Sequence, residues 1–211
     1  SRGLGDVYKR QIHNNIIMMH RSEKRKTQTS IFKTKEGISM NSSKKLDVKT
    51  LTFTALFAAL TYVATAIIKI PTPGTGGYIH PGDAIVVLSG IILGPVYGAL
   101  AAGIGSAMSD LLGGYFLYVP ATFIIKAVIA AVVAVVYSKL PASLFCSVRC
   151  AVCGIFSTVI VAAGYLIFEL FIYGAGALAS VPANIVQGVA GFIIAALLLP
   201  VLQKIIPKGA V

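Results

Sequence analysis

The sequence has little charge and no tryptophan. Of its 211 residues only 12% are charged and 56% are hydrophobic, and the mean hydropathy is +0.85. A soluble domain carries roughly 25% charged residues, because its surface must face water. This composition excludes a soluble enzyme, and three cysteines are too few for a disulfide scaffold. It also excludes a nucleic-acid-binding domain, despite a net charge of +11.

The few charges are unevenly placed along the chain. Residues 1–49 contain twelve Lys or Arg and four acidic residues, whereas residues 50–211 contain six and three. The second stretch cannot cover itself with polar side chains, so it requires lipid as its solvent. We therefore expect a basic N-terminal tail followed by an integral membrane domain.

Several catalytic patterns are also missing. No Lys follows a Gly, so the chain has no Walker A loop, and any ATP must be used by partner subunits. Only His80 lies close to an apolar segment, which leaves a Ser–His dyad dependent on one loop residue. Cys146, Cys150 and Cys153 share one helix face, but no His or acidic residue joins them, so no metal and no resident cofactor are expected. The pattern indicates binding rather than an enzyme.

The N-terminal region contributes no expected domain. Residues 1–11 resemble translated sequencing-adapter sequence, and residues 12–39 are polar and basic without sustained periodicity. Met40 precedes a short basic segment that runs into an apolar helix, so we expect it to be the true start. The expected organisation is a tail over residues 1–45 and one membrane domain over residues 46–206.

Six apolar stretches predict an all-α membrane protein with six transmembrane helices. They cover residues 51–70, 83–94, 95–112, 121–138, 146–173 and 182–206. A spanning helix needs about 20 apolar residues. The second stretch ends at Gly94-Pro95 and reaches only about 18 Å at 1.5 Å per residue, so we expect a short helix there.

The basic residues orient these helices. Lys139 and Arg149 lie in the fourth connection, and Lys204 and Lys208 lie near the C-terminus. The loops 71–82, 113–119 and 174–181 contain no Lys or Arg. Because cytoplasmic loops are enriched in Lys and Arg, we predict a multi-pass membrane protein with both termini in the cytoplasm.

Polar side chains gather at the predicted outer ends of the helices. Ionisable residues in membrane segments are costly and by default suggest function. The candidate substrate-binding residues are His80, Asp83, Asp110, Tyr115, Lys126, Tyr165, Glu169, Asn184 and Gln187. Tyr165 with Glu169, and Asn184 with Gln187, are spaced to share a helix face. We predict a polar pocket that opens to the outside.

Other interpretations of these residues remain open. They are also compatible with interfacial side chains that reach the headgroups, together with an Asp–Lys pair between helices. For Asp83 alone, N-capping of a helix is the better interpretation. Seven outer aromatic residues fit either an interfacial belt or a wall on which a flat heterocycle stacks; they are Tyr78, Tyr115, Phe116, Tyr118, Phe168, Phe171 and Tyr173.

Two stretches carry a family resemblance. They are GGYIHPGDAIVVLSGIILGPVYGALAAGIGSAMSDLLGGYFLYVPATFIIKA (76–127) and GYLIFELFIYGAGALASVPANIVQGVAGFIIAALLLP (164–200). Both resemble the substrate-binding S components of energy-coupling factor (ECF) vitamin importers. The similarity is to the branch of riboflavin, hydroxymethylpyrimidine and pyridoxine transporters, and it extends over about residues 46–206.

The resemblance implies a six-helix protein of the bacterial plasma membrane that captures a vitamin from outside without changing it. It would dock on a transmembrane coupling subunit driven by two ATPases. Small residues of the first helix would meet that subunit, here Ala55 and Ala59 with Ala58 beside them, and residues 71–82 would cap the pocket. The resemblance leaves the vitamin open among hydroxymethylpyrimidine, pyridoxine and riboflavin types.

Two other functions compete with this one. A proton-coupled secondary transporter of a small metabolite would use Asp110, Lys126 or Glu169 as its relay. No inverted repeat is evident, and the predicted inner half has few polar residues for an inward-facing site. An intramembrane enzyme would depend on His80.

Overall fold

The computed structural model describes residues 18, 19, 21, 23, 24 and 48–205. The chain divides into two units, residues 1–45 and residues 46–211. In the first unit the five described residues are helical, a feature that the sequence did not predict. The expectations for residues 1–11 and for Met40 lie outside the described residues.

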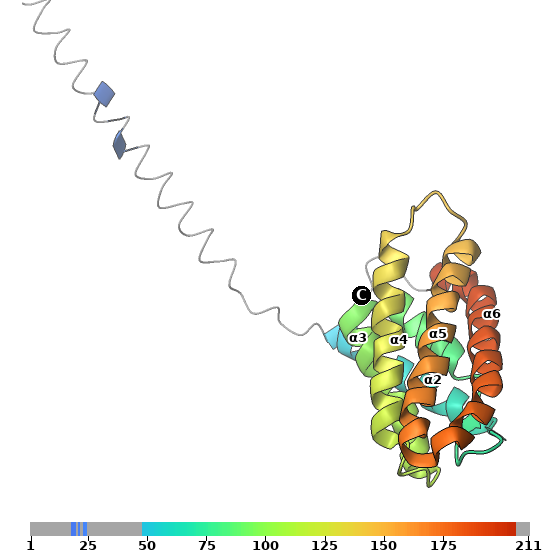
Figure 1. The fold of residues 1–211 in the computed structure, drawn as a ribbon. Helices are drawn as coiled ribbons and strands as arrows, with labels where there is room; N and C mark the ends of the chain where they lie inside the picture. Colours follow the sequence, from blue (N-terminus) through green and yellow to red (C-terminus); the bar gives the residue numbers. More distant parts are fainter. Residues whose placement is uncertain (1–17, 20, 22, 25–47, 206–211) are drawn as a thin grey trace, which may run out of the picture. The chain divides into compact units, whose positions relative to one another are not determined.

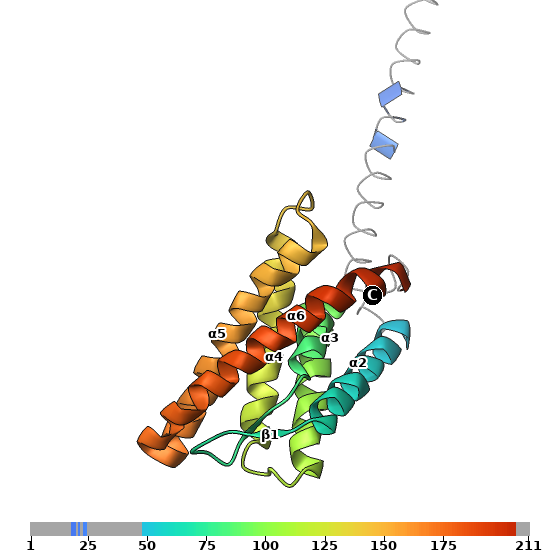
Figure 2. The ribbon, with the colours of Figure 1, turned by 90° about the vertical axis from the view of Figure 1, so that its right-hand side faces the viewer.

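The second unit is built from long helices joined by short connections (Figure 1). Its elements are α2 (Val48–Ile67), β1 (Ile70–Pro71), β2 (Tyr78–Ile79), α3 (Asp83–Leu112), α4 (Val119–Lys139), α5 (Cys146–Tyr173), the 3-10 helix η1 (Gly174–Ser180) and α6 (Val181–Ile205). The strands form one antiparallel pair in which Ile70 faces Ile79. The all-α prediction is confirmed for the described residues apart from this small hairpin. The hairpin and η1 lie at one end of the helices, and the α4–α5 connection lies at the opposite end (Figures 1 and 2).

Helix α3 reverses direction in its middle. Gly94 has φ 79° and ψ −177°, a conformation that only glycine adopts readily, and Pro95 follows it. The Ser89 hydroxyl donates a hydrogen bond to the Gly98 carbonyl oxygen at 3.2 Å. Residues nine positions apart in a continuous helix would be separated by about 13 Å. The two halves of α3 therefore pack against each other, as the predicted break at Gly94-Pro95 requires.

Glycines allow the helices to approach closely. A Cβ atom on Gly90 would meet the backbone of Ala130 in α4, and one on Gly105 would meet the carbonyl oxygen of Ala58 in α2. A Cβ atom on Gly191 in α6 would meet Asp83. Small residues at such contacts are how membrane helices pack without a hydrophobic driving force between them.

Four helical stretches in the described part of the chain are long and apolar enough to cross a membrane. They are Val48–Ile67, Asp83–Leu112, Val119–Lys139 and the 60-residue stretch Cys146–Ile205, which includes α5, η1 and α6. Length and composition therefore do not by themselves give the predicted six spans.

The first predicted helix extends too far. Helix α2 ends at Ile67 rather than at residue 70, because Ile70 pairs with β2. Lys69 consequently lies in the connection after α2, where its ammonium group donates to the Ser109 carbonyl oxygen at 3.3 Å. The first outer connection therefore begins at residue 68 rather than at residue 71, and it contains one lysine that the predicted loop 71–82 did not include.

Candidate functional site

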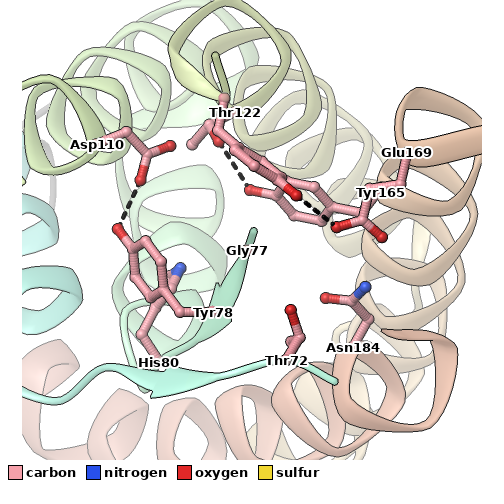
Figure 3. Close-up of a pocket in the computed structure, with 10 residues that line it drawn as sticks. Thr72, Gly77, Tyr78, His80, Asp110, Thr122, Tyr165, Glu169 and Asn184 are labelled. Carbon is pink, nitrogen blue, oxygen red and sulfur yellow. Dashed lines mark hydrogen bonds between the residues drawn. The ribbon is translucent and has the colours of Figure 1, made fainter. Parts of the chain in front are cut away.

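A small polar cavity lies where the hairpin meets the helix ends (Figure 3). Its volume is about 20 Å³, enough for roughly one water molecule. Ten residues line it: Thr72, Gly77, Tyr78, His80, Asp110, Tyr118, Thr122, Tyr165, Glu169 and Asn184. They come from the hairpin segment, α3, the α3–α4 connection, α4, α5 and α6, so every helix of this unit except α2 contributes to the cavity.

The hairpin is joined to α3 through a carboxylate. The Tyr78 hydroxyl donates to Asp110 Oδ1 at 2.5 Å. Burial, followed by the bond to Asp110, raises the pKa of Tyr78, so its hydroxyl stays protonated as a donor. The Tyr78 ring also packs against Tyr115 at a centroid distance of 4.5 Å, and the Lys69 ammonium group lies over both rings.

A second carboxylate lies on the side formed by α5. The Tyr118 hydroxyl donates to Glu169 Oε1 at 3.0 Å, and the Ser180 hydroxyl donates to Glu169 Oε2. Burial raises the pKa of Tyr118, which keeps this hydroxyl protonated as well. A Cβ atom on Gly77 would lie 3.2 Å from both Glu169 Oε1 and the Tyr118 hydroxyl. Glycine at this position therefore lets the hairpin backbone approach the carboxylate.

A fully buried ion pair lies next to the cavity. Lys126 Nζ donates to Asp83 Oδ1 at 2.5 Å, and both side chains have no exposed surface. Gln187 donates to Asp83 Oδ2 at 2.9 Å and accepts the His80 backbone N–H at 3.0 Å. This network joins α3, α4, α6 and the hairpin segment. The N-capping interpretation of Asp83 is wrong, because Gly82 is the N-cap and no side chain caps the helix.

His80 is neutral in this environment. Burial, with a further contribution from the positive charge of Lys126, lowers the pKa of His80 to about 3. Its Nδ1 accepts the Gly82 N–H at 3.1 Å, so the ring proton of the neutral imidazole is on Nε2. His80 therefore faces the cavity as a neutral side chain.

The structure divides the predicted site residues into three groups. His80, Asp110, Tyr165, Glu169 and Asn184 line the cavity. Asp83, Lys126 and Gln187 form the network beside it, and Tyr115 packs on Tyr78. The structure thus brings these residues together at one end of the helices, and their role in binding stays a prediction.

Five lining residues were not among the predicted site residues: Thr72, Gly77, Tyr78, Tyr118 and Thr122. Two of the tyrosines belong to the outer aromatic group, whose members point in different directions. Tyr78 and Tyr118 contact carboxylates, whereas Phe116 and Phe171 are 67% and 88% exposed. The sequence could have pointed to Tyr78 and Tyr118 through their residue type, because a buried tyrosine hydroxyl needs a polar partner and a phenylalanine does not.

The three alanines predicted to meet a partner differ in exposure. Ala55 and Ala59 are exposed on α2, whereas Ala58 is half-buried and faces α3 through its contact near Gly105. Among the described residues no cluster of His, Cys, Asp or Glu could hold a metal ion, and the three cysteines are free thiols.

Comparison with known proteins identifies a family. The family model for the "ECF-type riboflavin transporter, S component" matches residues 45–204, which is most of the chain. This family consists of transporter subunits rather than enzymes, and its members are multi-pass membrane proteins.

Three relatives illustrate the range of similarity. An uncharacterised protein of Pyrococcus woesei is 32% identical over 143 residues, which cover 67% of this chain and 93% of that protein. The thiamine precursor transporter HmpT of Lactococcus lactis subsp. cremoris is 27% identical over 163 residues, covering 75% of this chain and 90% of HmpT. A UPF0397 protein of Streptococcus pneumoniae is 38% identical over 74 residues, covering 35% and 40% of the two chains.

Proposed function

The chain belongs to the S-component family of ECF-type riboflavin transporters, and from this premise we propose that it captures a small heterocyclic vitamin or vitamin precursor from outside the cell. The bound molecule is carried inward after the protein docks on a transmembrane coupling subunit and two ATPases. Hydroxymethylpyrimidine, pyridoxine and riboflavin are the candidate ligands. The name of HmpT, a thiamine precursor transporter, supports the first of these.

The cavity beneath the hairpin carries this proposal. Its walls hold hydrogen-bonding groups from four helices, and they are buried at one end of an otherwise apolar bundle. Buried polar groups in a membrane protein are expensive and are retained for a task. With a volume of about 20 Å³, the cavity must widen to admit a ring, and the hairpin segment that covers it is the part that we expect to move.

The proposed orientation follows from the charges and the bundle. The two halves of α3 run in opposite directions, and so do α5 and α6 (Figure 2). This arrangement supports six crossings with both termini in the cytoplasm. The cavity then faces outward. Ala55 and Ala59 are exposed on α2, where they are available to the coupling subunit.

Binding and uptake test the proposal separately. Purified protein in lipid nanodiscs should bind one of the three candidate vitamins without turnover. Cells should accumulate that vitamin only when the coupling subunit and the ATPases are present. Asn184→Ala should weaken binding about tenfold, whereas the exposed Phe116→Leu should bind normally. Ion-gradient-driven uptake by the purified protein alone in liposomes would instead establish a secondary transporter.

A further inference from the structure

The cavity wall is acidic. Its ten lining residues include two carboxylates, Asp110 and Glu169, and none of them is Lys or Arg. His80 is neutral, because burial lowers its pKa to about 3. The walls therefore hold two acidic groups and no basic residue to balance them.

The neighbouring cations among the described residues are already occupied. Lys126 is fully buried in its ion pair with Asp83. Lys69 binds the Ser109 carbonyl oxygen and lies over the rings of Tyr78 and Tyr115. Neither lysine lines the cavity.

The tyrosine hydroxyls of the wall have already used their protons. Tyr78 and Tyr118 each donate to a carboxylate, and Thr122 and Tyr165 share a hydrogen bond of 3.0 Å. A carboxylate oxygen accepts more than one hydrogen bond, and a hydroxyl oxygen that has donated its proton still accepts. The two carboxylates and these hydroxyls thus offer acceptor positions to a ligand that brings donors, while His80 Nε2 and the Asn184 amide can donate to acceptors of the same ligand.

An anionic ligand fits these walls poorly. A phosphate group would lose its hydration and meet two carboxylates without a basic partner, and both effects disfavour burial of its charge. An amino group or a protonated ring nitrogen would instead form charge-assisted hydrogen bonds with Asp110 or Glu169. The rings of Tyr118 and Tyr165, 6.4 Å apart between centroids, add aromatic surface for a flat ligand.

We propose that the substrate is a single-ring, amino-substituted heterocycle, neutral or singly positive and without a phosphate group. An aminopyrimidine has this chemistry. The proposal rests on the function proposed above and narrows its three candidates to one class. The size of the cavity supports it, since a single ring needs less widening than a fused tricyclic ring system.

Calorimetric titration of the full-length protein in nanodiscs tests this choice. The probes are 4-amino-5-hydroxymethyl-2-methylpyrimidine, its phosphate ester, pyridoxine and riboflavin. The aminopyrimidine should bind tightest, and its phosphate ester should bind at least about a hundredfold more weakly. Asp110→Asn and Glu169→Gln remove one charge each, and each should weaken aminopyrimidine binding about tenfold and reduce the discrimination against the ester. Phe116→Leu is the matched control.

The outcomes separate the two proposals. Tighter binding of riboflavin, pyridoxine or the ester by the unmodified protein would overturn the substrate class and leave the vitamin-binding function intact. Folded variants that bind the aminopyrimidine as the unmodified protein does would also overturn it. If folded protein binds none of the four probes, the proposed function fails together with this inference. The ranking of the probes requires no variant, so it remains decisive even if a substitution prevents folding.

Discussion

At the scale of single residues, the Asp83–Lys126 pair places two opposite charges in the fully buried interior of the helical unit. Both side chains are fully buried, and the Asp83 carboxylate also accepts a hydrogen bond from the Gln187 amide. Removing one partner of a buried ion pair leaves the other charge without compensation, at a cost of about 3–5 kcal/mol, whereas removing both is often nearly neutral. We therefore expect Lys126→Met to destabilise the protein strongly.

The double variant Asp83→Asn/Lys126→Met provides the control. The amide oxygen that Asp83→Asn introduces would still accept from Gln187, while the pair of charges is gone. Thermal unfolding followed by circular dichroism in detergent should show the double variant well above Lys126→Met in Tm. Equal melting temperatures for the two would show that the lysine is not needed to balance the charge of Asp83.

The lowered pKa of His80 should make the stability of the folded protein depend on pH. Its pKa is about 3 in the folded protein, below the usual value of about 6.5 for an unfolded chain. Between these values the unfolded chain binds a proton that the folded protein does not. Stability from this residue is therefore complete above about pH 6.5 and is lost as the pH falls toward about 3.

A substitution isolates this effect. In His80→Asn the amide oxygen can accept the Gly82 N–H, as asparagine does in turns, but the side chain does not titrate. Lowering the pH from 7.5 to 4.5 should reduce the Tm of the unmodified protein more than that of His80→Asn. Parallel decreases in Tm would mean that other groups account for the acid sensitivity.

At the scale of elements, the positions of the long helices were predicted well from the sequence, whereas the hairpin was expected only as a loop. The stretch 146–173 agrees with α5, and the stretch 182–206 begins one residue after α6 does, while its last residue lies outside the described part of the chain. Runs of apolar residues ended by Gly and Pro carry that information. The end of α2 was misplaced because Ile68 and Ile70 continue the apolar stretch, whereas in the structure Ile70 pairs with Ile79 of β2.

The direction of the outer aromatic side chains was also beyond the sequence. An interfacial belt and a pocket wall use the same residue types at the same depth, so position along the chain cannot separate them. A tyrosine hydroxyl indicates a need for a polar partner, but only the fold shows that Asp110 is the partner of Tyr78. The clustering of polar residues at one end was predictable, and an Asp–Lys pair between helices was one of the interpretations that the sequence allowed. The sequence did not show which aspartate pairs with Lys126, or that Gln187 joins the pair.

The contact between α3 and α4 depends on a glycine. A Cβ atom on Gly90 would meet the backbone of Ala130, which has no flexible atoms to move aside. Gly90→Ala should therefore force the helices apart and destabilise the protein by about 1–3 kcal/mol. In Gly176→Ala the new Cβ atom would lie 3.5 Å from its nearest neighbour, so stability should be unchanged. The Tm values of the two variants test this, and a normal Tm for Gly90→Ala would contradict the close packing.

At the scale of the whole molecule, the proposed six crossings assign each connection to one side of the membrane. Single cysteines at Ser143 and Ala175, both exposed, report the α4–α5 and α5–α6 connections in a background with Cys146, Cys150 and Cys153 replaced by alanine. An impermeant maleimide should label the cysteine at position 175 on intact cells. It should label the cysteine at position 143 only after permeabilisation. Labelling of both from one side would contradict a crossing of the membrane by α5.

The proposed coupling subunit would bind a surface separate from the cavity, so vitamin capture and transport would use different parts of the molecule. The cavity is formed by the hairpin, α3, α4, α5 and α6, whereas Ala55 and Ala59 lie exposed on α2. Close helix contacts require small residues, so a bulky side chain at Ala59 should block docking without reaching the cavity. Ala59→Trp should keep normal vitamin binding in nanodiscs while uptake by cells with the coupling subunit falls to background.

Leu60→Trp is the matched control, because Leu60 is also exposed on α2 but lies about 100° further around the helix. It should retain both binding and uptake if the docking surface is the alanine face. Co-purification with the coupling subunit gives an independent measure and should be lost only in Ala59→Trp. If Ala59→Trp transports normally, the docking surface lies elsewhere on the bundle. If it loses vitamin binding as well, α2 shapes the cavity, and the separation between capture and docking does not hold.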